Sequence, residues 1–100
     1  MAAGVVMRIR FYVDPETGEP HIYNHGVTKA EVQQVLNRPG EDLSAKDGAR
    51  MALGQTTAGR YLRVIYVLDH EPDSVFVITA YELKGKPLKA FRSRQRRRRS

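Results

Sequence analysis

Residues 50 to 81 read RMALGQTTAGRYLRVIYVLDHEPDSVFVITAY, and this stretch decides the fold. Two short segments typical of turns, TAG and HEPD, divide it into three more apolar segments. The second and third of these are rich in β-branched and aromatic residues, which favour strands. Because the first turn is so short, the first two segments are expected to form an antiparallel hairpin. The predicted strands are residues 50 to 56, 61 to 68 and 74 to 81.

A period of two assigns the side chains of these strands to opposite faces. In the middle strand, one face receives Leu62, Val64, Tyr66 and Leu68. The alternation therefore makes Tyr66 more typical of a core residue than of a catalyst. Residues 7 to 13, MRIRFYV, show the same period and predict a further, half-buried strand. Its apolar face comprises Met7, Ile9, Phe11 and Val13.

The segment after residue 27 carries the signals of a helix N-terminus. Thr28 and Glu31 have the spacing of a capping box, in which each side chain binds the other residue's backbone N–H. Val27 and Val32 have the spacing of the accompanying hydrophobic staple. A Pro-Gly pair follows the apolar helical pattern and ends it. The sequence predicts a helix over residues 29 to 38.

The order of elements is therefore strand, helix and three strands, with residues 41 to 48 expected to form a loop or one short helical turn. This order predicts an α+β fold, in which one main helix packs on one face of a small antiparallel sheet of about four strands. The expected single domain covers residues 7 to 88.

The net charge of +6 is concentrated at one end of the chain. Residues 1 to 88 contain ten basic and eleven acidic residues, a net charge of −1, whereas residues 89 to 100 contain seven basic residues and no acidic one. Because like charges repel and stay hydrated, residues 89 to 100 are expected to form a disordered tail. Basic side chains here would attract RNA phosphates. The candidate RNA-binding residues are Lys84, Lys86, Arg92, Arg94, Arg96, Arg97, Arg98 and Arg99.

Composition also excludes several classes of protein. With 100 residues, 41% of them apolar, the chain can build one core. The absence of cysteine excludes disulfides and thiolate chemistry. No apolar run reaches the roughly 18 residues of a membrane span, and the start, MAAGVVMRIR, lacks a signal-peptide pattern. We therefore expect a cytoplasmic protein without a membrane partner, whose first residue is Met1 or Met7.

Common catalytic motifs are absent from the sequence. It contains no glycine-rich phosphate loop, no Gly-x-Ser-x-Gly elbow and no zinc spacing of Cys and His. His21 and His25 are four residues apart, as in a helical metal site, but Pro20 and Gly26 bracket them. We therefore expect neither a metal nor a cofactor.

The chain does contain histidine, arginine, lysine and tyrosine residues without obvious metal ligands, and these residue types suit metal-independent cleavage of RNA. There the ribose 2′-hydroxyl attacks the neighbouring phosphate, so the protein must supply a base, an acid and cations. His25 is a candidate acid or base, and Arg60 and Arg63 can hold a phosphate. Tyr81, like the tyrosines of the middle strand, can stack on a base or act as an acid. Each also has a structural interpretation, since a histidine can organise a turn and arginines can protect a strand edge.

Three motifs resemble the BrnT-like toxins of the RelE-type ribonuclease superfamily. Residues 24 to 28, NHGVT, resemble that family's KHGV segment. Residues 54 to 56, GQT, with residues 59 to 66, GRYLRVIY, resemble its strand pair iGxT…GRlLxVvY. Residues 77 to 81, VITAY, resemble its IISAR strand. The match runs in order through most of the chain between its first and last predicted strands.

The resemblance implies a toxin that cleaves mRNA and is blocked by a DNA-binding antitoxin encoded alongside. It implies catalytic roles for His25, Arg60, Arg63 and Tyr81. Two cations of the family pattern are missing, because Asn24 replaces a lysine and Tyr81 an arginine. Lys84 and Lys86 are candidates to replace them.

Two other functions fit the sequence. A non-catalytic module could bind nucleic acid through its basic tail, in which case removal of the residues after Leu88 would abolish binding. A protein-interaction domain could instead keep the fold and use the tail only for solubility.

Overall fold

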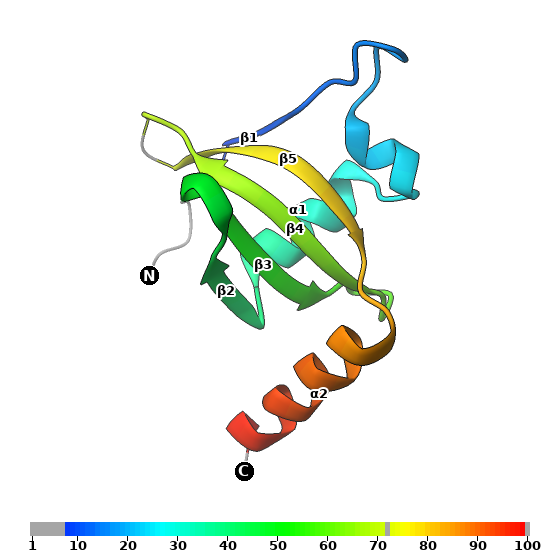
Figure 1. Ribbon diagram of the computed structural model, residues 1–100, viewed down its shortest axis with the longest axis vertical. Coiled ribbons are helices and arrows are strands. Elements are labelled where there is room, and N and C mark those ends of the chain that lie inside the picture. The colour runs from blue at the N-terminus through cyan, green and yellow to red at the C-terminus, as the bar shows by residue number, and fades with distance from the viewer. Residues whose placement is uncertain (1–7, 72, 100) are drawn as a thin grey trace.

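Five strands form one mixed sheet in the order β1-β5-β4-β3-β2 (Figure 1). The computed structural model describes residues 8–71 and 73–99. The strands are β1 (Arg8–Phe11), β2 (Glu41–Ser44), β3 (Arg50–Gln55), β4 (Tyr61–Leu68) and β5 (Ser74–Glu82). The helices are α1 (Lys29–Asn37), α2 (Gly85–Arg99) and the 3-10 helices η1 (His21–His25) and η2 (Lys46–Gly48).

Strands β2 to β5 form an antiparallel meander, as predicted for β3, β4 and β5. The prediction of about four strands in a wholly antiparallel sheet is wrong in two respects, since the sheet has a fifth strand and β1 pairs with β5 in parallel. After β1, the chain crosses one face of the sheet through η1 and α1 and enters β2 at the opposite edge. The residues of β2 had been assigned to a loop because their local sequence, EDLS, is polar.

Helix α1 begins as the sequence predicts. The Glu31 backbone N–H donates to Thr28 Oγ1 at 3.1 Å, and the Thr28 backbone N–H donates to Glu31 Oε1 at 3.0 Å. Val27 and Val32 are both buried. The helix ends at Asn37, with Arg38 as its C-terminal cap. The capping box is therefore confirmed, and the predicted extent of the helix is confirmed to within one residue at its C-terminal end.

The main core lies between α1 and the sheet. Val64 and Tyr66 of β4 face α1, and the Tyr66 hydroxyl donates to Asp42 Oδ2 at 2.6 Å. Burial, together with the Asp42 carboxylate, raises the pKa of Tyr66. The prediction of Tyr66 as a core residue is confirmed. Leu68 and Val13 were expected on the apolar faces of their strands, but they are 68% and 49% exposed. Leu68 is the last residue of β4, and Val13 lies beyond the end of β1.

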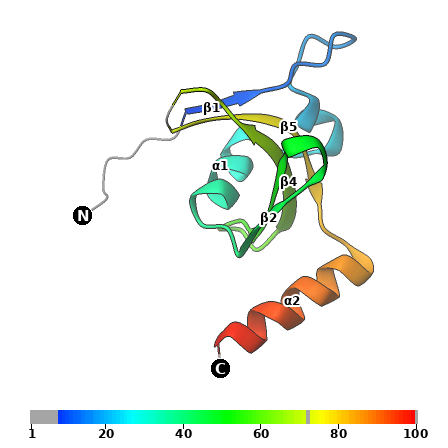
Figure 2. The same ribbon diagram turned by 60° about the vertical axis from the view of Figure 1, so that its left-hand side comes forward.

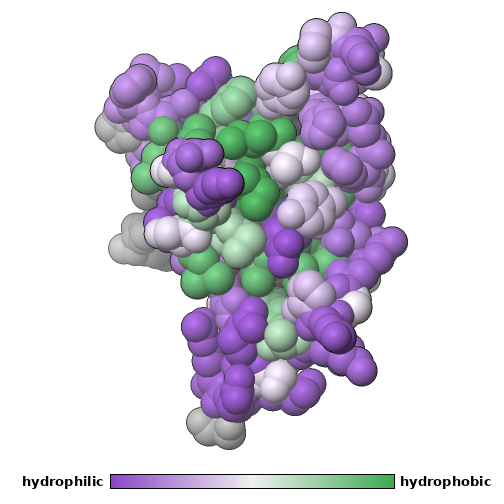
Figure 3. Space-filling view, in the orientation of Figure 1, coloured by the Kyte–Doolittle hydropathy of each residue, from purple (hydrophilic) through white to green (hydrophobic). Residues whose placement is uncertain are grey.

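The opposite face of the sheet is partly open. Figure 3 shows apolar residues gathered over this face, with charged residues around them. Leu43 and Ile78 are among the large apolar side chains that remain exposed. At one end of the sheet, however, Leu53, Leu83 and Phe91 form a second buried cluster. Phe91 belongs to α2, which lies across this end of the sheet (Figures 1 and 2).

The prediction of a disordered tail at residues 89 to 100 is wrong, since α2 extends to Arg99; Ser100, like residues 1 to 7, lies outside the described residues. The predicted domain boundary after residue 88 falls inside this helix. Phe91 anchors the helix, and Arg94 donates to the Glu41 carboxylate, whose side chain is only 2% exposed. Arginines near a helix C-terminus also interact favourably with the helix dipole. Among the described residues, no helix is long and apolar enough to cross a membrane.

Candidate active site

The position of His25 is set by the short helix η1. Ile22 is the buried residue of this helix and belongs to the main core. Gly26 ends the helix with φ of 70°, a left-handed conformation that glycine adopts without strain. The Gly26 backbone N–H donates to the carbonyl oxygen of Tyr23. His25 is thus exposed at the C-terminal end of η1, and Ile22 fixes this short helix to the core.

Three side chains from three elements meet beside η1. The rings of His25 and Tyr81 are in edge contact, with centroids 5.9 Å apart. Arg63 and Tyr81 are paired across β4 and β5, and the Arg63 guanidinium lies 5.7 Å from the centre of the Tyr81 ring. Arg63 Nη1 donates to the Tyr81 hydroxyl oxygen at 3.4 Å. An imidazole, a phenol and a guanidinium therefore share one surface.

Arg63 is the cation of this group, and no carboxylate of the described chain binds it. It forms no ion pair with a carboxylate in residues 8–71 or 73–99, and its buried Nε has no hydrogen-bond partner there. Thr79 Oγ1, on the same face of the neighbouring strand, is likewise buried without a described partner. Buried polar groups are usually paired, so Arg63 has capacity for an anion.

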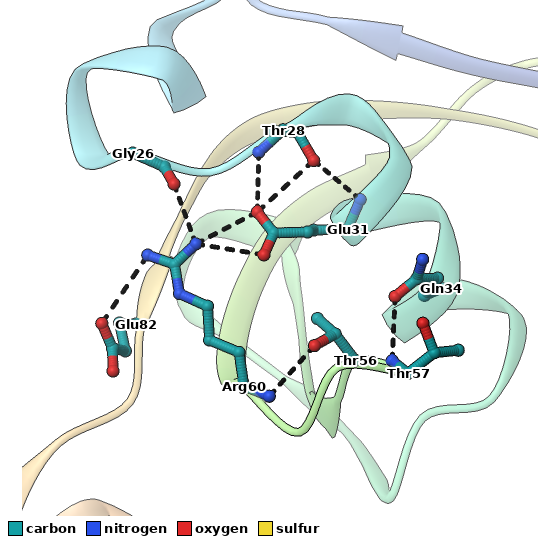
Figure 4. A network of polar contacts seen from close by, with 8 residues as sticks. All are labelled: Gly26, Thr28, Glu31, Gln34, Thr56, Thr57, Arg60 and Glu82. Carbon is teal, nitrogen blue, oxygen red and sulfur yellow. Dashed lines mark hydrogen bonds and ion pairs between the residues drawn. The ribbon is translucent and has the colours of Figure 1, made fainter.

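Arg60 lies close to this group but is already engaged (Figure 4). Its Nη1 donates to the Gly26 carbonyl oxygen at 2.8 Å and to both Glu31 carboxylate oxygens, and its Nη2 lies 3.6 Å from Glu82 Oε1. Burial alone would raise the pKa of Glu31, but hydrogen bonds from Thr28 and Arg60 outweigh it, and the pKa is lowered. Arg60 therefore joins the end of η1 to the start of α1, with its charge neutralised.

Of the four candidate catalytic residues, the structure brings His25, Arg63 and Tyr81 together. Arg60 touches the backbone next to His25 rather than joining the group. Two further residues, not selected from the sequence as catalytic, extend the cluster: the His21 ring lies 5.2 Å from the His25 ring and 6.1 Å from the Tyr12 ring.

His21 is held in place by polar neighbours, because its Nδ1 lies 3.4 Å from Asp14 Oδ2 and 3.4 Å from Asn24 Nδ2. A hydrogen bond from the Glu16 backbone N–H is the largest cause that lowers the pKa of Asp14. Hydrogen bonds from Asn24 and His21 lower this pKa further, and burial opposes them. In the part of the chain that the structure describes, no group of three His, Cys, Asp or Glu residues could hold a metal ion. The spacing of His21 and His25 was the sequence signal for this pair, and it was considered only for a metal.

The candidate RNA-binding residues differ in what they already contact. Arg94 is bound to Glu41, Arg98 donates to the Gly40 carbonyl oxygen, and the Arg92 guanidinium lies 5.7 Å from the centre of the Tyr61 ring. Lys84 and Lys86 are exposed and bind no carboxylate in the described chain, and neither is bonded to the His25 group. Arg96 and Arg97 lie on α2, and Arg99 is its last residue.

A groove of about 500 Å³ lies between the C-terminal end of α1, the β3–β4 hairpin and α2. Its lining includes three arginines, three glutamines, one tyrosine and no carboxylate. The charged and amide residues are Arg38, Arg92, Arg96, Gln34, Gln55 and Gln95. Sequence reasoning missed this groove because it exists only when α2 is docked.

Compared with models of known protein families and with curated proteins, the chain matches none. Function must therefore be argued from the arrangement of the residues.

Proposed function

We propose that this protein is a metal-independent endoribonuclease, similar in action to the BrnT-like and RelE-type toxins. The observation that carries this proposal is the convergence of His25, Tyr81 and Arg63 from three separate elements. An acid, a base and a phosphate-binding cation are the groups that RNA cleavage by the 2′-hydroxyl requires.

In the proposed reaction, His25 accepts the proton of the 2′-hydroxyl, whose oxygen forms a bond to phosphorus. The bond from phosphorus to the 5′-oxygen breaks, leaving a 2′,3′-cyclic phosphate and a free 5′-hydroxyl. Because Arg63 donates to the Tyr81 oxygen, the phenolic proton is left to be given to the departing 5′-oxygen. The other N–H groups of Arg63 stabilise the charge that grows on the phosphoryl oxygens.

A cleavage assay with end-labelled RNA tests this proposal. We expect His25→Ala to reduce the cleavage rate by roughly 10²- to 10⁴-fold, the usual contribution of a general acid or base. His70→Ala is the matched control, since His70 is exposed in the turn between β4 and β5 and lies outside the cluster. EDTA should have no effect. Pure, folded wild-type protein that leaves RNA intact would contradict the proposal.

A toxin of this kind acts on mRNA in the cytoplasm and is held inactive by a DNA-binding antitoxin. The exposed apolar face of the sheet, with Leu43 and Ile78, is a surface of the type that protein partners cover. Expression should therefore arrest growth, and His25→Ala should relieve the arrest. Co-expression with a DNA-binding protein encoded beside this chain should restore growth and yield a complex on purification.

One observation favours a second candidate function, non-catalytic binding of nucleic acid. The groove beside α2 is lined by arginines and by no carboxylate, and such a groove can attract RNA whether or not the protein cleaves it. Under this alternative, RNA is bound in a salt-dependent manner and remains intact, and His25→Ala has no effect on growth or on binding.

A further inference from the structure

We infer that the groove between α1, the β3–β4 hairpin and α2 binds a nucleotide of a single-stranded RNA chain, next to the linkage that the His25 group cleaves. This inference rests on the proposed function and adds to it a second site, formed by other residues. The groove volume of about 500 Å³ lies within the range of sites that hold small organic groups.

The charges of the groove favour a phosphate. Arg38 and Arg92 line it, and neither forms an ion pair with a carboxylate of the described chain. The Tyr61 ring holds the Arg92 guanidinium at this site by a cation–π contact. Since no carboxylate lines the groove, an anion entering it meets cations that are not neutralised locally.

The glutamines of the groove can recognise a base. Each is fixed at one atom: Gln34 Oε1 accepts from the Thr57 N–H, and Gln55 Nε2 and Gln95 Nε2 donate to the carbonyl oxygens of Gly59 and Gly40. The other polar atom of each amide has no partner among the described residues. One donor and two acceptors are thus oriented in advance, which is how amide side chains bind base edges.

The groove also adjoins the candidate active site. Tyr61 lines the groove, and Arg63 lies two residues further along β4 on the same face. Residues at this spacing in a strand are about 7 Å apart. An RNA chain bound at Arg63 can therefore continue past Tyr61 into the groove.

Binding of an RNA octamer that carries 2′-O-methyl groups tests the inference, because this RNA lacks the attacking hydroxyl and cannot be cleaved. We expect Arg38→Gln combined with Arg92→Gln to weaken binding at least about tenfold. The slope of log affinity against log salt should fall by about 1.4, for two lost phosphate contacts on a single strand. Fluorescence anisotropy at several salt concentrations measures both quantities.

The matched control is Lys46→Gln combined with Lys89→Gln, which removes the same charge from exposed positions outside the groove. It should weaken binding less than about threefold. Because Arg92 packs on Tyr61, Arg38→Gln alone is a second test that leaves α2 undisturbed, with an expected fall in slope of about 0.7. Equal losses for the groove and control pairs would overturn the inference, as would the absence of any binding.

The two proposals can fail separately. If groove-dependent binding is found but the wild type leaves unmodified RNA intact, the nuclease proposal fails and the groove stands. If His25-dependent cleavage is found but the groove and control pairs bind equally, the groove fails and the nuclease stands.

Discussion

At the scale of single residues, Arg60 shows how a motif can indicate a position and leave its role open. The resemblance implied a catalytic role for Arg60, and its chemistry suggested a phosphate contact, but its guanidinium is bound to the Gly26 carbonyl and to the Glu31 carboxylate. Arg63, three residues further along the chain, is the arginine without a bound carboxylate. We therefore assign Arg60 a positioning role, in which it holds the end of η1, and so His25, against α1.

The substitution Arg60→Ala tests this assignment. It leaves the Glu31 carboxylate, which is only 21% exposed, without its cation, and we expect the free energy of unfolding to fall by about 1–3 kcal/mol. Urea denaturation measures this change. Arg60→Lys should lose less stability, since one of several hydrogen bonds can be kept. A variant with wild-type stability and no cleavage would instead place Arg60 in contact with RNA.

The sequence predicted the three converging residues by motif, but not their neighbours. His25, Arg63 and Tyr81 each lie in a short recognisable pattern. The contacts of His21 and Tyr12 depend on the path of the loop between β1 and η1, where Val13 pairs with Pro20. No periodicity encodes such a path, so these two residues could not be assigned to the cluster in advance.

At the scale of elements, local signals account for α1, β3, β4 and β5, whereas β2 and α2 depend on each other. Glu41 of β2 is buried and bound by Arg94 of α2, so α2 docks partly through this pair. A Cβ atom at Gly40 would lie 2.7 Å from Phe91 Cζ, so the glycine lets the helix approach. Neither EDLS nor an arginine-rich segment reveals this partnership on its own.

The pH dependence of stability should report the Glu41–Arg94 pair. The hydrogen bond from Arg94 is the largest cause that lowers the pKa of Glu41 from its ordinary value of 4.5. A lowered carboxyl pKa gives stability that is fully present above pH 4.5 and is lost as the pH falls through the lower, folded-state value. We expect Glu41→Gln to be less stable than the wild type at pH 7 and to lose less stability below pH 4.5. Thermal melts between pH 3 and 7 measure the difference, and parallel curves would contradict it.

At the scale of the whole molecule, α2 is part of the folded domain and contributes to its core. Truncation after Leu88 removes Phe91, which is 2% exposed, and leaves Glu41 buried without Arg94. Loss of a buried phenylalanine alone costs about 3–5 kcal/mol, and we expect a loss of at least that size in urea denaturation. Truncation after Gln95 is the control, since it keeps both residues and should cost much less. Equal stability of the two truncated proteins would mean that α2 is not part of the core.

Because the stability of the domain depends on α2, RNA binding must be tested without removing this helix. Removing the basic segment would remove the groove and destabilise the domain together, so weaker binding would not separate the two causes. Substitutions at Arg38 and Arg92 keep Phe91 and Arg94, which hold α2 on the sheet, and so distinguish a specific site from the general attraction of RNA to cations.

The parallel pairing of β1 with β5 has a consequence for the kinetics of folding. Arg10 of β1 binds Asp69, 59 residues away, and together with Ser74 it lowers the pKa of Asp69 to about 2. Closing so long a loop is entropically slow, so the meander and α1 are expected to assemble first and β1 to join them late. Until then β5 presents unpaired backbone groups, which recruit strands from other molecules. Refolding at high concentration should therefore yield aggregates that begin at β5.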